Sequence, residues 1–414
     1  MDKKQPSLFN LAVIVGALGY FVDVYDLLLF SIIRVPSLKS LGLTQDQIAK
    51  DGLQILNIQM LGLLLGGIVW GILGDKKGRL KVLFASIILY SLGSIANGFV
   101  HTVGQYALVR FITGLGLAGE LGAGITLVSE LMPREKRGIA TSLVAGIGLS
   151  GAVFAYFIKV QFVAASGEGW RTCYFIGGAL GFLLLLLRVG VLESGMFKNI
   201  AEKNVRKGDF FMLFTNGKRL KKYLTAILIA LPNWYVIGIL VSFSKEFGAK
   251  MNVQGTVDPG KAIMVAYVAI SVGDVLIGFV SQWLKSRKLS LWLFHIITVV
   301  AVVWYFSLHG QTSASMYWAC VLLGFGTGFW AMFVTMAAEQ FGTNIRATVA
   351  TTVPNMARGS LNLVSLLFVY LQSATGDYVK SGWITGVIVF IIAFIALALT
   401  EETFGKDLDY IEQH

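Results

Sequence analysis

Six ionisable side chains lie deep inside long apolar segments of this chain. They are Asp23, Asp26, Arg110, Glu120, Asp274 and Arg358. A charged group in hydrocarbon costs several kcal/mol unless it is paired, hydrated or neutralised. The four acids Asp23, Asp26, Glu120 and Asp274 are therefore our candidates for groups that take up and release protons.

The charge sum of these six groups supports that interpretation. Four acids against Arg110 and Arg358 leave an excess of two negative charges. We expect Arg34, Lys159 and Arg188, near segment ends, to extend toward the aqueous boundary. Crowding and desolvation raise carboxylate pKa values, so proton binding would relieve the excess. An organic cation would relieve it equally well, and the sum alone does not choose between them.

Arg358 is the best candidate to hold an anion, because a guanidinium binds a carboxylate or phosphate through two hydrogen bonds. The alternative is an internal ion pair with Asp274 or Glu120. Further candidate substrate contacts offer hydrogen bonds or an aromatic wall; these are Tyr25, Gln59, Arg110, Asn233, Trp234 and Tyr235.

The composition explains where these groups must sit. Of 414 residues, 56% are hydrophobic and only 14% are charged, whereas soluble domains carry about a quarter charged residues. Segments of roughly 20 apolar residues cross a bilayer as helices. We predict an all-α membrane protein with twelve such spans, near 10–34, 52–74, 80–100, 104–131, 138–162, 172–192, 222–244, 261–284, 289–309, 313–338, 346–372 and 381–400.

Basic residues set the expected orientation and division of the chain. With the N-terminus inside, about 22 Lys and Arg fall in inner loops and about seven in outer ones. We expect both termini in the cytoplasm and the protein in the cell inner (plasma) membrane. The predicted parts are an N-terminal six-helix half at 1–192, a basic cytoplasmic linker at 193–221, a second half at 222–400 and a tail at 401–414. The net charge of +11 thus reflects topology, not nucleic-acid binding.

A loop signature and an internal repeat mark the cytoplasmic side. Gly71, Gly74, Asp75, Gly78 and Arg79 lie between the second and third spans. Glu130 and Arg137 follow the fourth span, and Glu339 and Arg346 repeat the same spacing after the tenth. The expected cytoplasmic gate comprises Gly71, Asp75, Gly78, Arg79, Glu130, Arg137, Glu339 and Arg346. The loop resembles the G-x-L-x-D-[RK]-x-G-R-[RK] signature of the major facilitator superfamily.

Two other spans resemble subfamilies of that superfamily. The fourth, with Gly119-Glu120 and a later Ser129-Glu130, is similar to metabolite:proton symporters and to phosphate:proton symporters. The first, with Asp23-Val-Tyr25-Asp26, resembles the same two groups. In both, the acid at the position of Glu120 lies beside the substrate path. Leu121 and Gly122 stand where those families have Trp or Pro.

The resemblance implies a secondary transporter in which two pseudo-symmetric halves alternate access to a central site. We expect proton-coupled symport of a small carboxylate-type anion, by a monomer in the bilayer. The alternatives are phosphate, or a cationic or neutral metabolite or drug, including antiport. A membrane receptor or scaffold is the non-transport alternative. No catalytic, cofactor or metal-binding pattern is found, so we do not expect an enzyme.

Overall fold

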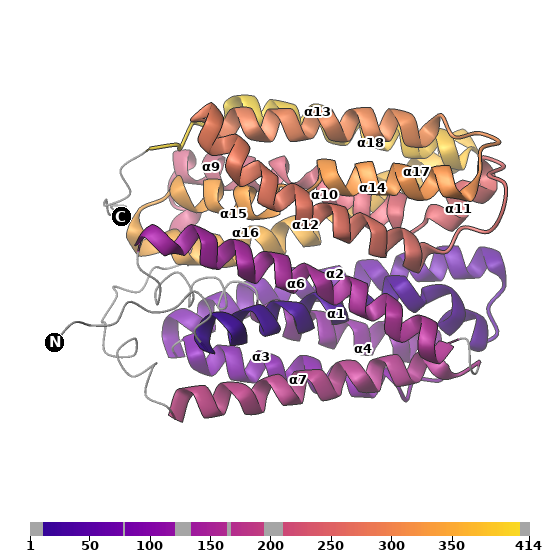
Figure 1. Ribbon diagram of the computed structural model, residues 1–414, viewed down its shortest axis with the longest axis horizontal. Coiled ribbons are helices and arrows are strands. Elements are labelled where there is room, and N and C mark those ends of the chain that lie inside the picture. The colour runs from indigo at the N-terminus through magenta and orange to yellow at the C-terminus, as the bar shows by residue number, and fades with distance from the viewer. Residues whose placement is uncertain (1–10, 78, 121–133, 164–166, 194–209, 406–414) are drawn as a thin grey trace.

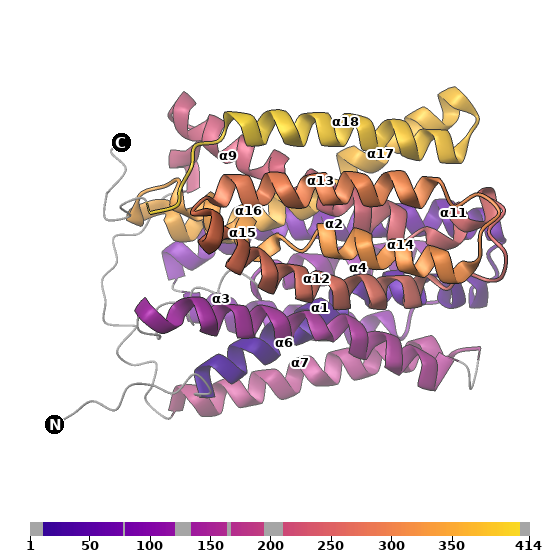
Figure 2. The same cartoon turned by 45° about the horizontal axis from the view of Figure 1, so that its top comes forward.

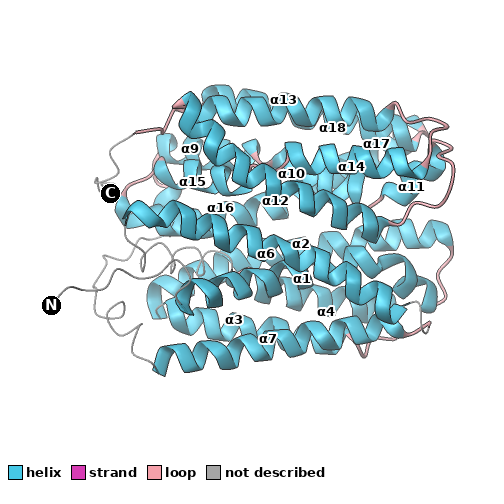
Figure 3. Cartoon of the chain, viewed as in Figure 1, coloured by secondary structure: helices cyan, strands magenta, loops and turns pink. Residues whose placement is uncertain are grey.

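The structure, a computed structural model, describes residues 11–77, 79–120, 134–163, 167–193 and 210–405, which are almost entirely helical (Figure 3). The elements are α1 (Leu11–Ser40), α2 (Gln45–Lys77), α3 (Arg79–Asn97), α4 (Val103–Leu117), α6 (Arg134–Val163), α7 (Gly169–Glu193), η1 (Phe210–Leu213), α9 (Gly217–Ile229), α10 (Leu231–Tyr235), η2 (Val236–Val241), α11 (Ser244–Lys250), α12 (Pro259–Leu284), α13 (Arg287–Phe306), α14 (Ser313–Gly326), α15 (Trp330–Glu339), α16 (Thr343–Gly359), α17 (Leu361–Thr375) and α18 (Tyr378–Leu399).

The described helices follow the order of the twelve predicted spans, and the all-α membrane fold is confirmed. In the described residues, nine helical runs are long and apolar enough to cross a membrane, and α3 contributes a shorter apolar helix. The fourth span begins as α4, and the eleventh consists of α16 followed by α17. The helices α1 and α2 extend several residues beyond the predicted limits. Exposed leucine, valine and phenylalanine side chains cover the outer surface, as expected for a face turned to lipid.

Three spans of the second half are interrupted, which the hydropathy pattern does not predict. The seventh changes from α10 to the π-helical turn η2 soon after Pro232. The tenth breaks between α14 and α15, where Gly328 packs against Gly273 so closely that a Cβ atom on Gly328 would lie 2.6 Å from the Gly273 Cα. The eleventh breaks at Ser360. Such breaks expose backbone groups that can bind ligands or side chains.

The helices form two groups that meet along the long axis of the molecule. In Figure 1 the indigo-to-magenta helices of the first half lie below the orange-to-yellow helices of the second. Figure 2 shows the same division from another side. The main contacts between the groups are α6 with α12 and α2 with α16. The architecture is therefore two six-helix halves around a shared interface.

Two ion pairs join the halves at the end of the bundle that carries α11, here called the α11 end (right in Figure 1). Arg34 of α1 donates to Glu246 of α11 at 2.8 and 3.0 Å. Lys159 of α6 contacts Asp258, the N-cap of α12, at 2.5 Å. The side chains of this pair are 1% and 9% exposed. These contacts hold the α11 end closed in this structure.

Toward the opposite end, α2 and α16 approach closely through small residues. A Cβ atom on Gly67 would lie 2.7 Å from the Asn355 Cβ, and one on Gly71 would touch Thr352. Asn355 also donates to the Ala118 carbonyl at 2.9 Å. The glycines of α2 thus permit the two halves to close on this side of the interface as well.

Candidate functional site

A small cavity lies between the two halves. Its volume is about 30 Å³, close to the space of one water molecule. Six helices from both halves supply its walls, which are formed by Tyr20, Val24, Leu27, Leu149, Asn233, Trp234, Tyr267, Ile270, Trp330 and Arg358. Three predicted substrate contacts, Asn233, Trp234 and Arg358, are therefore brought together. A cavity of this volume has no room for a metabolite in this conformation.

Local breaks in the second half position the aromatic side chains. Pro232 occupies the first turn of α10, where a missing N–H costs nothing, and the next residues are Asn233 and Trp234. Trp330 begins α15 directly after the break at Gly328. The two indole rings pack edge to face, with centroids 6.3 Å apart. The interrupted helices thus present two tryptophans to one cavity.

Arg358 forms the one ion pair at this cavity among the described residues, and it is a weak one. Its Nη2 lies 3.4 Å from Oδ2 of Asp23, across the interface between the halves. Strong charge-assisted pairs are about 2.7–2.9 Å long. Nε and Nη1 of Arg358 and Oδ1 of Asp23 have no partner within the described ranges, although both side chains are almost fully buried. Arg358 therefore keeps capacity to bind another anion.

The second acid of the first span pairs inside the N-terminal half. Asp26 accepts from Arg110 Nη2 at 3.2 Å and from Ser94 at 3.1 Å. Arg110 also donates to the Asp26 carbonyl and lies over the Tyr174 ring. Neither Asp26 nor Arg110 belongs to the cavity wall. The predicted role of Arg110 as a substrate contact is not supported by this placement.

Glu120 pairs with Arg188, which corrects one sequence-based expectation. Arg188 does not extend toward water; it is 5% exposed and binds both carboxylate oxygens of Glu120, one of them at 2.9 Å. Gly19 of α1 leaves room for this pair. The correction also changes the charge sum. Arg34 does not extend toward water either, since it is 1% exposed and pairs with Glu246. Apart from that pair, the four deep acids now face Arg110, Arg188 and Arg358, so the excess is one negative charge.

The remaining negative charge is that of Asp274, whose carboxylate caps the N-terminal end of α15. Its Oδ1 accepts from the backbone N–H of Ala331 at 3.1 Å, at the start of α15. The partial positive charge of a helix N-terminus stabilises a carboxylate. Asp274 is buried, but the helix end satisfies it without an arginine. The alternative pairing of Arg358 with Asp274 or Glu120 does not occur.

Three predicted substrate contacts instead make hydrogen bonds to the backbone. Tyr25 donates to the Cys173 carbonyl at 2.8 Å, Gln59 to Leu27 at 3.1 Å, and Tyr235 to Gly382 at 2.8 Å. None of these three lines the cavity. In this conformation these side chains connect neighbouring helices and do not point into the cavity.

The predicted cytoplasmic gate is partly described. Glu339 ends α15 and accepts from Arg287 of the second half at 2.6 Å and from Thr403, just after α18, at 2.8 Å. Arg346 donates to the Phe341 carbonyl. Gly71 lies at the α2–α16 contact. Gly78 and Glu130 lie outside the described residues, as do the side chains of Asp75, Arg79 and Arg137. The latch role of this group stays a prediction.

Sequence reasoning missed three aromatic wall residues, Tyr20, Tyr267 and Trp330. Tyr20 lies three residues before Asp23 of the first-span motif, and Trp330 follows a glycine-containing break. Those neighbours are the signals that could have found them. Tyr267 has no such signal in the sequence.

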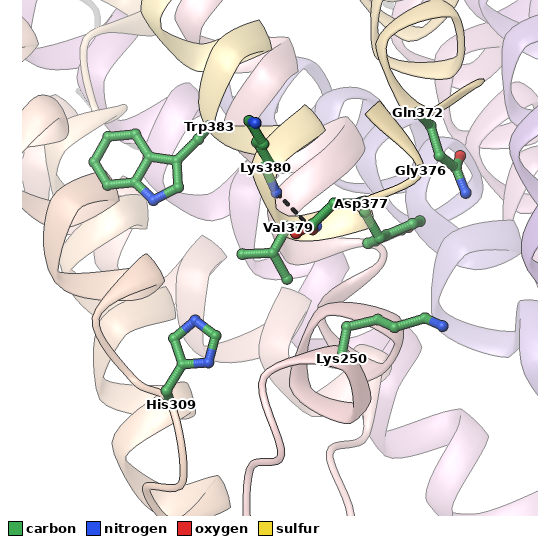
Figure 4. Close-up of a pocket in the computed structure, with 9 residues that line it drawn as sticks. Lys250, His309, Gln372, Gly376, Asp377, Val379, Lys380 and Trp383 are labelled. Atoms are coloured by element: carbon green, nitrogen blue, oxygen red, sulfur yellow. Dashed lines mark hydrogen bonds between the residues drawn. The ribbon is translucent and has the colours of Figure 1, made fainter. Parts of the chain in front are cut away.

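A second, open pocket of about 670 Å³ lies at the α11 end of the C-terminal half (Figure 4). Its wall includes Lys250, His309, Lys380 and Trp383. The carboxylate of Asp377 is directed to the first backbone N–H groups of α18. This pocket is built by one half alone, so it differs from the cavity that both halves share.

Comparison with known proteins identifies the class to which this architecture belongs. The model of the Major Facilitator Superfamily matches residues 16–364. The chain belongs to this superfamily, and it is a multi-pass membrane transporter, not an enzyme.

Individual relatives agree over most of the chain. The niacin transporter NiaP of Acinetobacter baylyi is 27% identical, covering 97% of this chain and 96% of the relative. A putative niacin/nicotinamide transporter of Bacillus subtilis is 24% identical, covering 86% and 87%. The inward open xylose transporter XylE from E. coli has a TM-score of 0.72 at 15% identity, covering 96% of this chain and 97% of that chain. The last comparison shows the shared fold.

Proposed function

We propose that this chain is a proton-coupled symporter of small carboxylate-type organic anions. The observation that carries the proposal is Arg358, buried at the cavity between the halves with only a 3.4 Å pair to Asp23. One relative described as a niacin transporter and one described as a putative niacin/nicotinamide transporter support the same cargo class, because niacin is a small carboxylic acid. A single guanidinium among aromatic walls suits a monoanion better than phosphate, which is typically held by several donors.

Charge balance couples the proton to the cargo. If a carboxylate bound to Arg358 while Asp23 stayed ionised, two negative charges would share one guanidinium in a low-dielectric site. Protonation of Asp23 removes that repulsion and frees Arg358. On release of the cargo, Asp23 loses its proton and pairs with Arg358 again. The site is then neutral in both the loaded and the empty transporter.

The predicted topology completes the proposal. With both termini in the cytoplasm of a cell bounded by the plasma membrane, the α11 end faces outward, and the units 1–192 and 222–400 rock about the cavity, joined by 193–221. Opening the α11 end requires the Arg34–Glu246 and Lys159–Asp258 pairs to break. Asp23 would then meet protons and cargo from outside.

Proteoliposome transport tests this function. With an acidic medium outside, labelled niacin should accumulate inside proteoliposomes that contain the unmodified protein. Asp23→Asn should abolish accumulation driven by the pH gradient but retain exchange of labelled for unlabelled cargo. Arg358→Gln should lose both. Asp46→Asn, an exposed acid at the start of α2, is the matched control and should behave as wild type. Competition by amines in place of carboxylates would contradict the proposal.

A further inference from the structure

Several buried hydrogen-bond donors at the cavity lack a partner. They are Nε1 of Trp234, Nε1 of Trp330, and Nε and Nη1 of Arg358. The three side chains are 3%, 8% and 2% exposed. No acceptor for these donors is found in the part of the chain that the structure describes. Native proteins rarely leave buried donors unpaired unless a ligand or a function uses them.

The chemistry of these groups restricts what can satisfy them. An indole N–H and a guanidinium can only donate, never accept. A ligand that occupies the cavity must therefore accept hydrogen bonds at more than one place. A carboxylate can serve Arg358. The indoles, which come from α10 and α15, require a further acceptor on the ligand.

The walls also favour a particular shape. Four aromatic side chains, Tyr20, Trp234, Tyr267 and Trp330, line the same cavity. The Arg358 guanidinium lies 5.9 Å from the centre of the Trp330 ring. Aromatic walls favour flat rings, through offset stacking or edge-to-face contact. A flexible aliphatic chain would gain less from them.

We propose that the cargo is a planar aromatic monocarboxylate with a second hydrogen-bond acceptor on its ring, and that Trp234 and Trp330 determine this specificity through their indole N–H groups. The inference rests on the proposed function, since it assumes that Arg358 holds the carboxylate. It adds the ring and the second acceptor. The cavity must widen from its closed volume before such a ring fits, so Trp234 and Trp330 must move apart as the halves rock.

A ligand series on the purified protein tests the proposal without any mutation. Binding of pyridine-3-carboxylate (niacin), benzoate, cyclohexanecarboxylate and acetate is measured by calorimetry at one pH, at which all four carboxylates are ionised and the pyridine nitrogen is unprotonated. We expect pyridine-3-carboxylate, which has a ring nitrogen acceptor, to bind about five- to tenfold more tightly than benzoate, the effect of one hydrogen bond. Benzoate should exceed cyclohexanecarboxylate, and acetate should bind weakest.

Substitution of the two tryptophans assigns the effect. Trp234→Phe and Trp330→Phe keep a ring but remove the N–H donor. In at least one of these variants, pyridine-3-carboxylate and benzoate should bind with about equal affinity. The affinity for benzoate itself should change little. Trp318→Phe, at a lipid-facing position 66% exposed, is the matched control and should leave the preference unchanged.

The outcomes separate the two proposals. Equal binding of cyclohexanecarboxylate and benzoate, or a pyridine preference that survives in both Phe variants, would overturn the specificity inference and leave the carboxylate symport intact. Failure of every carboxylate to bind, at any pH tested, would overturn the proposed function and this inference together.

Discussion

Replacing Gly19 by alanine tests whether the Glu120–Arg188 pair is a structural element. An added Cβ atom on Gly19 would overlap the ends of both Arg188 and Glu120. These side chains are 5% and 1% exposed, so they cannot simply swing into water. The methyl group must therefore separate the two charges or displace α1. In either case a buried ion pair loses its geometry.

The expected cost follows from two opposing terms. Breaking a buried pair costs about 3–5 kcal/mol, and alanine in place of a helical glycine returns about 1 kcal/mol. The net loss is about 2–4 kcal/mol, which for a cooperative unit of roughly 200 residues lowers the melting temperature by about 4–16 °C. Thermal unfolding of the detergent-solubilised protein, followed by circular dichroism, measures this change.

Gly146→Ala is the control for this experiment. Gly146 lies in α6 of the same half, and an added Cβ atom there would meet no atom within 4 Å. We expect its melting temperature to stay equal to that of the wild type or to rise slightly. If the melting temperatures of Gly19→Ala and Gly146→Ala are equal, the reasoning that ties Gly19 to the ion pair is refuted.

Two further predictions concern charges at the two ends of the bundle. Lys159→Glu should place like charges beside Asp258 and raise the population open at the α11 end by up to about fivefold, since a partly exposed pair contributes about 1 kcal/mol. Adding Asp258→Lys to Lys159→Glu should reverse this change. Unchanged distances between spin labels across the α11 end would contradict the prediction. At the other end, burial opposes ionisation of Glu402, but hydrogen bonds from Ser286 and from the backbone N–H groups of Phe404, Arg287 and Lys288 lower its pKa. Its carboxylate therefore adds stability above the unfolded value of about 4.3, and this is lost as pH falls through the lower folded pKa. Glu402→Gln should melt below the wild type at pH 7, and this gap should narrow as the pH falls below about 4.3; a gap of constant size across that range would disprove the linkage.

The fold could be predicted well because hydropathy in a membrane protein is a strong signal. Apolar stretches must be helical there, since no water is available to bond the backbone. The same signal does not find the breaks at Thr327–Phe329 or Ser360, because each break lies inside a segment that is predicted as one continuous span.

The site was predicted less completely. Arg358, Asn233 and Trp234 could be found because polar and charged residues are rare in the spans. The ion pairs could not be found from the sequence. Arg188 lies near the end of the sixth predicted span, yet it pairs with Glu120 of the fourth span. The hydrogen bond made by Tyr25 likewise depends on helix packing. The sequence alone therefore does not distinguish a residue that lines the cavity from one that holds two helices together.

The order in which the buried pairs can form has a consequence for synthesis. Glu120 and Arg188 are 68 residues apart, and Asp26 and Arg110 are 84 apart, so both pairs can close within the first half. Asp23 is separated from Arg358 by 335 residues. At about 5–20 residues per second, a ribosome needs tens of seconds to supply that counterion. During this interval Asp23 must be neutral or hydrated, so the newly inserted first half carries the acid before its arginine exists.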